Sequence, residues 1–181
     1  MSSNGAGKST LAPALLRDTL GILEFVNADT IAEGLSAFAP DDASFDAGRV
    51  MLGRLHELAA DGKDFALETT LASRFYAGWL SELQSNGAYR VSLVFLWLRS
   101  VDLAIARVAA RVKLGGHSIP EDTIRRRYER STKNFFELYQ PIANAWRFFN
   151  AGVEPATEIA SYNEKDGEII FDEELWNQIK K

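Results

Sequence analysis

The apolar residues of the chain recur in two patterns, which predict strands and helices in alternation. Short runs rich in β-branched and aromatic residues predict strands at 23–27, 65–69, 89–98 and 146–150. Apolar positions at helical spacing predict helices at 10–18, 49–60, 75–83, 101–112 and 120–139. The run at 89–98 is apolar almost throughout, so we expect a central strand there.

This alternation is typical of an α/β fold. Strands that alternate with helices give a mostly parallel sheet with right-handed crossovers and helices on both faces, the three-layer fold of P-loop NTPases. We expect one domain over 1–181, in which the helices on either side of Gly115-Gly116 form a lid over about 107–133. A β-hairpin around Asp166-Gly167 and a short helix are expected over about 157–180.

Composition narrows the class of protein. The chain has 181 residues, of which 46% are hydrophobic and 25% charged, as in an ordinary globular domain. It has no cysteine and two histidines, which excludes disulfides and thiolate metal sites. The longest apolar run, Val91–Leu98, is too short to span a bilayer, and no targeting leader is visible. We therefore expect a cytoplasmic protein with no membrane partner.

The distribution of charge favours a small anionic ligand. The net charge is −5, which argues against nucleic acid as a partner. Between Arg99 and Lys133, however, nine basic residues face four acidic ones. Such a basic island in an acidic chain suits the binding of a multiply charged small molecule, and a solvated helix face is the alternative interpretation.

The first residues contain the closing half of a phosphate-binding P-loop. Asn4-Gly5-Ala6-Gly7-Lys8-Ser9-Thr10 matches the end of the pattern G-x-x-x-x-G-K-[ST]. Backbone N–H groups around Gly5 can wrap the phosphates of ATP, Lys8 can reach the β and γ oxygens, and the Ser9 hydroxyl can bind Mg²⁺. Ser2 stands where the first glycine of the motif belongs, and no apolar strand precedes the loop. We therefore expect the sheet to lack its first, central strand, through a late start codon, a truncated gene or a remodelled sheet.

Two carboxylates follow predicted strands. Asp29 comes after the first strand, and Glu68 precedes Thr69-Thr70 at the end of the second. Ligands of open α/β sheets bind beyond the carboxyl ends of the strands, so these positions are candidates for chemistry. Asp29 can accept the proton of a hydroxyl that attacks a γ-phosphoryl group, or it can cap a helix from Thr30 onward. Glu68 can hold substrate or a metal-bound water, or it can pair with a nearby arginine.

Four arginines of the lid pair up by spacing. Arg107 and Arg111 share one helix face at i, i+4, and Arg127 and Arg130 share another at i, i+3. Guanidinium groups at these positions can stabilise the charge of a phosphoryl-transfer transition state, and Arg111 and Arg127 are the preferred candidates. The tryptophans at 79, 97 and 146 are interpreted as packing residues.

With these motifs placed, the chain resembles the zeta-toxin-like family of P-loop kinases from Asn4 to about Asn150. The resemblance rests on four segments: Asn4–Thr10, Asn27-Ala28-Asp29, Leu67-Glu68-Thr69-Thr70, and Gly115–Pro120 with Arg125–Tyr128. It implies Mg·ATP as the phosphoryl donor and a UDP-activated amino sugar as the acceptor. It also implies a sheet with its strands in the order 2-3-1-4-5, in which strand 1, the strand before the P-loop, is central.

The resemblance implies a role for several residues. Asp29 matches the family's general base, and Lys8 its P-loop lysine. Arg49, Glu68 and Thr69 fall on the substrate side, with Leu52 where a carboxylate is expected one turn after Arg49. His117 stands where the toxins carry a phosphate-binding arginine, and we interpret it as a loop residue. An antitoxin partner is implied for toxins of the family, but no such segment is fused to this chain.

The leading hypothesis is therefore an ATP-dependent kinase that phosphorylates a hydroxyl of a small molecule, with UDP-sugars as the implied acceptors. A catalytically inactive nucleotide-binding remnant or truncated product is the first alternative. Another P-loop ATPase is the second, although no Leu-Ser-Gly-Gly-Gln stretch and no Asp-Glu strand end are present.

Overall fold

The computed structural model describes residues 21–36, 43–116 and 118–181. The predicted P-loop Asn4–Thr10, with Lys8 and Ser9, lies outside these residues, as do the predicted helix 10–18 and His117. The described residues form two compact units, one ending at Thr69 and the other beginning at Thr70. The prediction that the chain is one domain with a lid stays a prediction.

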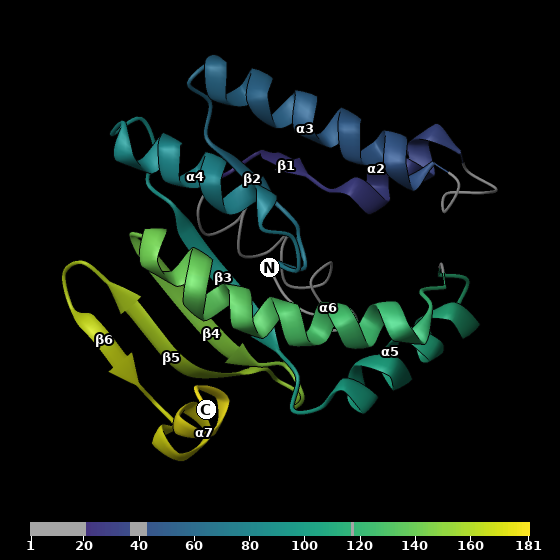
Figure 1. Cartoon of the computed structure of the whole chain (residues 1–181), viewed down its shortest axis with the longest axis vertical. Helices are drawn as coiled ribbons and strands as arrows, with labels where there is room; N and C mark the ends of the chain where they lie inside the picture. Colours follow the sequence, from purple (N-terminus) through teal and green to yellow (C-terminus); the bar gives the residue numbers. More distant parts are fainter. Residues whose placement is uncertain (1–20, 37–42, 117) are drawn as a thin grey trace. The chain divides into compact units, whose positions relative to one another are not determined.

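The described part of the first unit contains two strands and two helices. Its elements are β1 (Glu24–Val26), α2 (Ala28–Leu35), α3 (Ser44–Ala60) and β2 (Phe65–Leu67). The two strands are parallel, with Val26 opposite Leu67. Helix α3 contacts both α2 and β1, and Figure 1 shows it as the long helix beside these elements. The carboxyl ends of β1 and β2 therefore lie at the same edge of this small sheet.

Helix α3 begins five residues before the predicted start at Arg49, so the predicted boundary is wrong. Its buried positions are Ala47, Met51, Leu55 and Leu58, spaced four, four and three residues apart. Val50, an apolar residue at the start of the predicted helix, is 49% exposed. The buried face of α3 thus excludes Val50 and starts earlier than the predicted helix, at Ala47.

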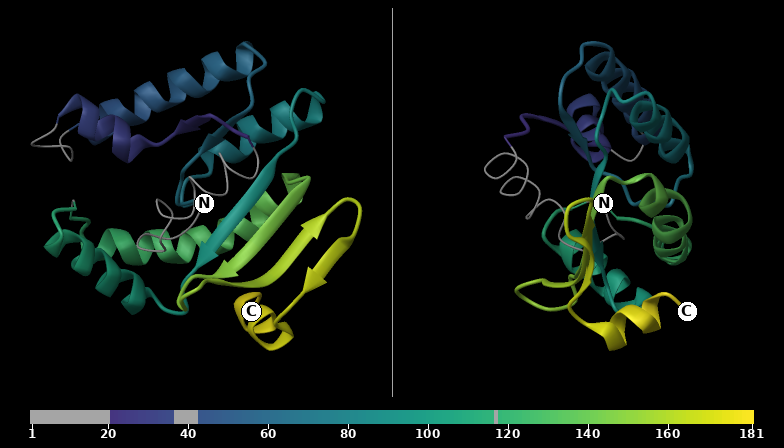
Figure 2. Two further views of the ribbon diagram at one scale, coloured as in Figure 1. Left: turned by 180° about the vertical axis from the view of Figure 1, so that it is seen from behind. Right: turned by 90° about the vertical axis from the view of Figure 1, so that its left-hand side faces the viewer.

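The second unit is built on a four-stranded sheet, seen from behind in the left view of Figure 2. Its strands, in spatial order, are β3 (Ser92–Trp97), β4 (Ala145–Asn150), β5 (Thr157–Asn163) and β6 (Gly167–Ile170). Its helices are α4 (Phe75–Ser85), α5 (Val101–Lys113), α6 (Glu121–Asn134) and α7 (Glu173–Ile179). A π-helical turn (Phe135–Tyr139) and a 3-10 turn (Gln140–Ile142) extend α6 towards β4.

The strand pairing confirms part of the predicted sheet. The pairs β1–β2 and β3–β4 are parallel. The expected order 2-3-1-4-5 counts the strand before the P-loop as strand 1, so β1 and β2 correspond to its neighbours 2-3, and β3 and β4 to its neighbours 4-5. The pairs β4–β5 and β5–β6 are antiparallel, because β5 and β6 form the predicted hairpin. The sheet of the second unit is therefore mixed rather than mostly parallel. The expectation of a missing first strand concerns residues before Gly21, outside the described ranges.

Two apolar clusters cover the two faces of β3. Leu93, Phe95 and Trp97 belong to one cluster, which also holds Phe135, Trp146 and Trp176. Leu96 and Leu98 belong to the other, which α5 and α6 complete with Ala104, Val108 and Ile124. A strand buried on both faces explains the continuous apolar run of the sequence. The tryptophans at 79, 97 and 146 all pack in or against the first cluster, as predicted.

Hydrogen bonds from α6 and its π-helical extension hold the segment that follows β2. Leu71 is fully buried and adopts a φ of +59°, a left-handed conformation that is unusual for leucine. The side-chain amide of Asn134 donates to the Leu71 carbonyl at 2.7 Å, and the Tyr139 hydroxyl donates to the Ser73 carbonyl at 2.6 Å. Two donors from one helical segment therefore fix the path of the chain just after Thr69-Thr70.

Candidate functional site

Asn27 begins helix α2 directly after β1. Its side-chain oxygen accepts hydrogen bonds from the backbone N–H of Asp29 at 2.7 Å and of Thr30 at 3.4 Å. An asparagine oxygen in this position satisfies N–H groups that have no partner inside the helix. Asn27 is therefore the N-cap of α2, and the alternative interpretation that Asp29 caps the helix is wrong.

Asp29 lies in the first turn of α2, exposed to solvent. Within the described residues its carboxylate makes no hydrogen bond or ion pair. Asp29 thus presents an exposed carboxylate just after a strand end, at the position where the sequence predicts a base.

Glu68 follows β2 at the same edge of the sheet. The amide nitrogen of Asn27 donates to Glu68 Oε2 at 3.0 Å, between residues 41 positions apart in sequence. The backbone N–H of Glu68 also donates to the Val26 carbonyl at 3.0 Å, which continues the pairing of the strands. Glu68 and Thr69 are both half-buried. The structure thus brings Glu68 to the start of the helix that carries Asp29.

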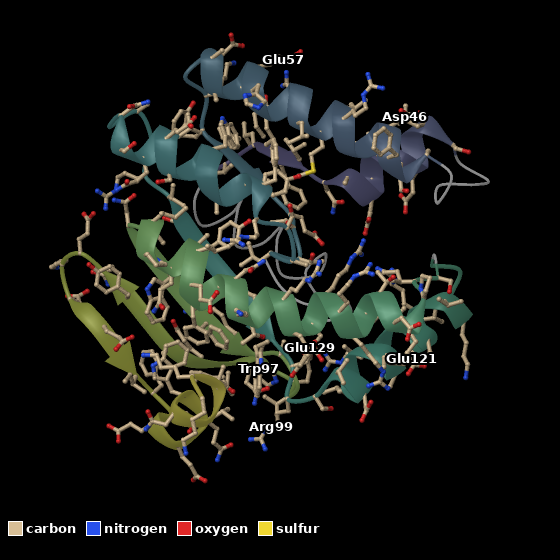
Figure 3. The ribbon with its side chains drawn as sticks, in the orientation of Figure 1. Asp46, Glu57, Trp97, Arg99, Glu121 and Glu129 are labelled. Carbon is tan, nitrogen blue, oxygen red and sulfur yellow. The ribbon has the colours of Figure 1, made fainter. Side chains whose placement is uncertain are left out.

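Arg49 lies on α3 of the same unit and points to solvent. Its guanidinium is 3.8 Å from the carboxylate of Asp46, and both side chains are about seven-tenths exposed. Asp46 lies near the start of α3 in Figure 3, and Glu57 near its other end. So loose an ion pair contributes little to stability, which leaves the Arg49 guanidinium available for a ligand.

Helix α3 is tied to β1 by a different arginine. Arg54 donates to Glu24 Oε2 at 3.0 Å and lies 3.5 Å from Glu57. The hydrogen bond from Arg54 to Glu24 is the main reason that the pKa of Arg54 is raised. Arg54 therefore holds the helix against the strand, whereas Arg49, five residues earlier, has a loose contact with Asp46 on its own helix.

The predicted lid arginines belong to the second unit. Arg107 and Arg111 are on α5, and Arg127 and Arg130 are on α6. The helices are joined by Arg125, which donates to Glu121 at 2.7 Å and to Asp102 at 3.2 Å. Glu121 is labelled at the start of α6 in Figure 3.

Arg125 and Arg127 differ in their partners. The hydrogen bond to Glu121 is the main reason that the pKa of Arg125 is raised, and the hydrogen bond to Asp102 raises it to a smaller extent. Arg127 is half-buried and has no acidic partner within the described part of the chain. A guanidinium without a carboxylate partner is the one suited to bind an added anion.

The break between the two helices depends on glycine. Gly115 adopts a φ of +90°, and a methyl group on Gly116 would lie 2.7 Å from Arg111 Cγ and 3.1 Å from its carbonyl oxygen. The backbone therefore returns so close to Arg111 that only glycine fits at 116 without a shift.

Of the predicted site, the structure brings Asp29, Glu68 and Thr69 to one edge of the β1–β2 sheet. Arg49 lies on α3 of that unit, and Arg111 and Arg127 lie in the other unit. Among the described residues, no group of three or more His, Asp or Glu side chains is arranged to hold a metal ion. None of the helices within the described ranges is long and apolar enough to cross a membrane.

Sequence reasoning missed the part that Asn27 plays. Its type and place contained the signal, since asparagine between a strand and an Ala-Asp-Thr start is a preferred helix N-cap. Its second contact, with Glu68, depends on the parallel register of β1 and β2, which local sequence does not encode.

Comparison with known proteins shows the fold and one relative. No protein-family model matches the chain. Solved structures of the AvrRxo1-ORF1:-ORF2 complex contain a chain of similar fold. With ATP, the TM-score is 0.80 at 15% identity, over 99% of this chain and 61% of that one. With sulphate ions, the TM-score is 0.73 at 18% identity, over 99% and 62%.

The chain thus spans about three-fifths of the length of the AvrRxo1 chains that it resembles. The likeness establishes a mixed α/β fold of that kind. In sequence, an uncharacterised protein of Haemophilus influenzae (strain ATCC 51907 / DSM 11121 / KW20 / Rd) is 35% identical over 126 residues. This match covers 70% of this chain and 87% of the relative. The chain belongs to the same family as this Haemophilus influenzae protein.

Proposed function

We propose that the chain is an ATP-dependent kinase that transfers the γ-phosphoryl group of Mg·ATP to a hydroxyl of a small molecule. The observation that carries this proposal is Asp29, whose carboxylate is exposed at a strand end and is not used as a helix cap. Phosphoryl transfer to a hydroxyl requires a base that can accept the hydroxyl proton, and a carboxylate that does not cap a helix can do so.

Two further findings support ATP as the donor. The sequence Gly5-Ala6-Gly7-Lys8-Ser9 has the residue types that wrap a triphosphate, with Lys8 for the phosphate oxygens and Ser9 for Mg²⁺. The AvrRxo1-ORF1:-ORF2 structure that contains a chain of similar fold was solved with ATP. Neither finding identifies the acceptor, for which UDP-sugars are the first class to test.

In the proposed reaction the acceptor oxygen forms a bond to the γ-phosphorus while the bond from that phosphorus to the β–γ bridging oxygen breaks. Asp29 takes the proton of the acceptor hydroxyl, and ADP leaves. Glu68 and Thr69 hold the acceptor from the neighbouring strand end, and Arg49 binds its anionic part. Ser9 would hold Mg²⁺, which when bound would neutralise charge on the phosphates. Arg111 and Arg127 are the proposed candidates for stabilising the charge that spreads over the transferring group.

Calorimetry with Mg·ATP tests the donor site. We expect saturable binding to the wild-type chain and its loss in Lys8→Ala, because the ammonium group is the main cationic contact of a P-loop. If the wild-type chain does not bind Mg·ATP, the kinase proposal is wrong.

Transfer to a panel of UDP-sugars tests the base. We expect Asp29→Asn to keep the ATP affinity and to lower the transfer rate by about 10²- to 10⁴-fold. Glu33→Gln, which changes an exposed carboxylate one turn further along α2, is the matched control and should keep the wild-type rate. Binding without transfer to any acceptor would favour the inactive remnant, and transfer to water alone would favour another ATPase.

A further inference from the structure

We propose that Asn27 is a positioning residue that fixes the Glu68 carboxylate to the start of helix α2, and so sets the acceptor side of the site. This inference rests on the proposed function, because it assigns Glu68 to the acceptor. The coupling between the two side chains, however, can be measured without any enzymatic assay.

Both ends of the Asn27 amide are in use. Its oxygen accepts from the N–H groups of Asp29 and Thr30, and its nitrogen donates to Glu68 Oε2 at 3.0 Å. Because backbone N–H groups demand an acceptor and a carboxylate demands a donor, only one orientation of the amide satisfies both sides. A single side chain therefore links the first turn that carries Asp29 to the end of β2.

This link restricts the conformation of the Glu68 side chain. A glutamate loses up to about 2 kcal/mol of rotamer entropy when it is held in one conformation. Asn27 contributes to this restriction before any acceptor arrives, and the parallel register of Val26 with Leu67 keeps the two strand ends at a fixed spacing. Preorganisation of this kind raises the rate because the acceptor contact is in place before reaction.

The capping and positioning roles can be separated by substitution. Serine and aspartate are good helix N-caps, so Asn27→Ser and Asn27→Asp keep the acceptor for the N–H of Asp29. Serine is too short to donate to Glu68, and aspartate places a second carboxylate against it. Adding Glu68→Gln to Asn27→Asp supplies an amide that can donate to the carboxylate introduced at position 27. The double variant therefore restores the hydrogen bond with its direction reversed.

We would measure urea unfolding of the wild type, Asn27→Asp, Glu68→Gln and the double variant. The expected result is a double variant whose unfolding equilibrium constant is about tenfold more favourable to the folded state than the two single changes predict together. Additive effects would overturn the inference, since residues that do not interact give no coupling.

The rate of transfer to a UDP-amino sugar supplies the second readout. We expect Asn27→Ser to remain folded, to keep the ATP affinity within about twofold and to lower kcat/KM for the acceptor about tenfold. A merely structural role for Asn27 would leave the transfer rate of this folded variant unchanged, and that result would overturn the inference.

Asn163 provides a matched control in the β5–β6 hairpin. Its oxygen accepts from the N–H groups of Lys165 and Asp166, and its nitrogen donates to Asp166 Oδ2 at 3.1 Å. Asn163→Ser should therefore leave acceptor transfer unchanged. If the wild type transfers no phosphoryl group but the unfolding cycle shows coupling, the proposed kinase function fails while the link from Asn27 to Glu68 stands.

Discussion

Tyr139 is a fully buried phenol whose ionisation links stability to pH. Burial, with a smaller effect from Tyr76, raises its pKa to about 12 from the ordinary value of 10. The folded state therefore keeps its proton between pH 10 and 12, whereas the unfolded chain releases it. The stabilisation of the folded state by the protonated Tyr139 phenol is fully present below pH 10 and is lost as the pH rises through 12. Within this window the free energy of unfolding falls by about 1.4 kcal/mol per pH unit.

Tyr139→Phe isolates this effect. At pH 8 we expect the variant to be less stable by about 0.5 to 1.5 kcal/mol, because it loses the hydrogen bond to the Ser73 carbonyl. At about pH 11 the difference should shrink or reverse, since phenylalanine does not ionise in the unfolded state. Urea unfolding at the two pH values gives the measurement, and a difference that stays constant would contradict the raised pKa.

At the same scale, the sequence predicted some site residues and missed another for a physical reason. Asp29 and Glu68 were predictable as candidates because apolar runs mark the strands and the residues that follow mark their carboxyl ends. The link between them through Asn27 was not, because it joins residues 41 positions apart and depends on strand pairing.

At the scale of elements, the π-helical turn places two donors on one side of a helical segment. In an α-helix, residues five apart point about 140° away from each other, so Asn134 and Tyr139 could not both face the segment 71–73. The hydrogen bond from the Gln140 N–H to the Phe135 carbonyl closes a wider turn and brings them to the same side. The π-helical turn thus holds the Leu71 backbone at a positive φ, a strain of about 1 to 2 kcal/mol.

Asn134→Ala tests this support. We expect the free energy of unfolding to fall by about 1 to 3 kcal/mol, because a buried amide that donates to the Leu71 carbonyl is removed. Asn177→Ala, which changes an exposed asparagine of α7, is the control and should cost under about 0.5 kcal/mol. Equal effects of the two changes in chemical denaturation would show that the Asn134 contact contributes nothing.

Elements with a strong local signal were predicted within a few residues. β4 and the hairpin strands were found because β-branched and aromatic runs end at turn residues. The start of α3 was missed because its first buried residue, Ala47, is small and lies between Asp46 and Gly48. The positive φ of Leu71 has no glycine or proline signal, since contacts with distant residues impose it.

At the scale of the whole molecule, the described parts of the two units differ in the size of their sheets and apolar clusters. The described sheet of the first unit has two strands of three residues each, whereas the second unit has four strands and two apolar clusters. Two short paired strands are marginal by themselves, so their amides should open at a lower free energy than those of a buried strand. We therefore expect hydrogen exchange in β1 and β2 to be faster than in β3 and β4.

Binding of Mg·ATP should reduce the difference in hydrogen-exchange rate between β1 and β2 on the one hand and β3 and β4 on the other. A ligand that binds only the folded state stabilises it by about 2.7 kcal/mol at a concentration of about 100 Kd. If Asp29 and Glu68 take part in the proposed site, exchange of the amides at 27–30 and 68–69 should slow, while the Asn163–Gly167 turn should keep its rate. Mass-spectrometric exchange with and without Mg·ATP, repeated on Lys8→Ala, measures this. Slowing that persists in Lys8→Ala would mean that the P-loop lysine is not what couples nucleotide to these strand ends.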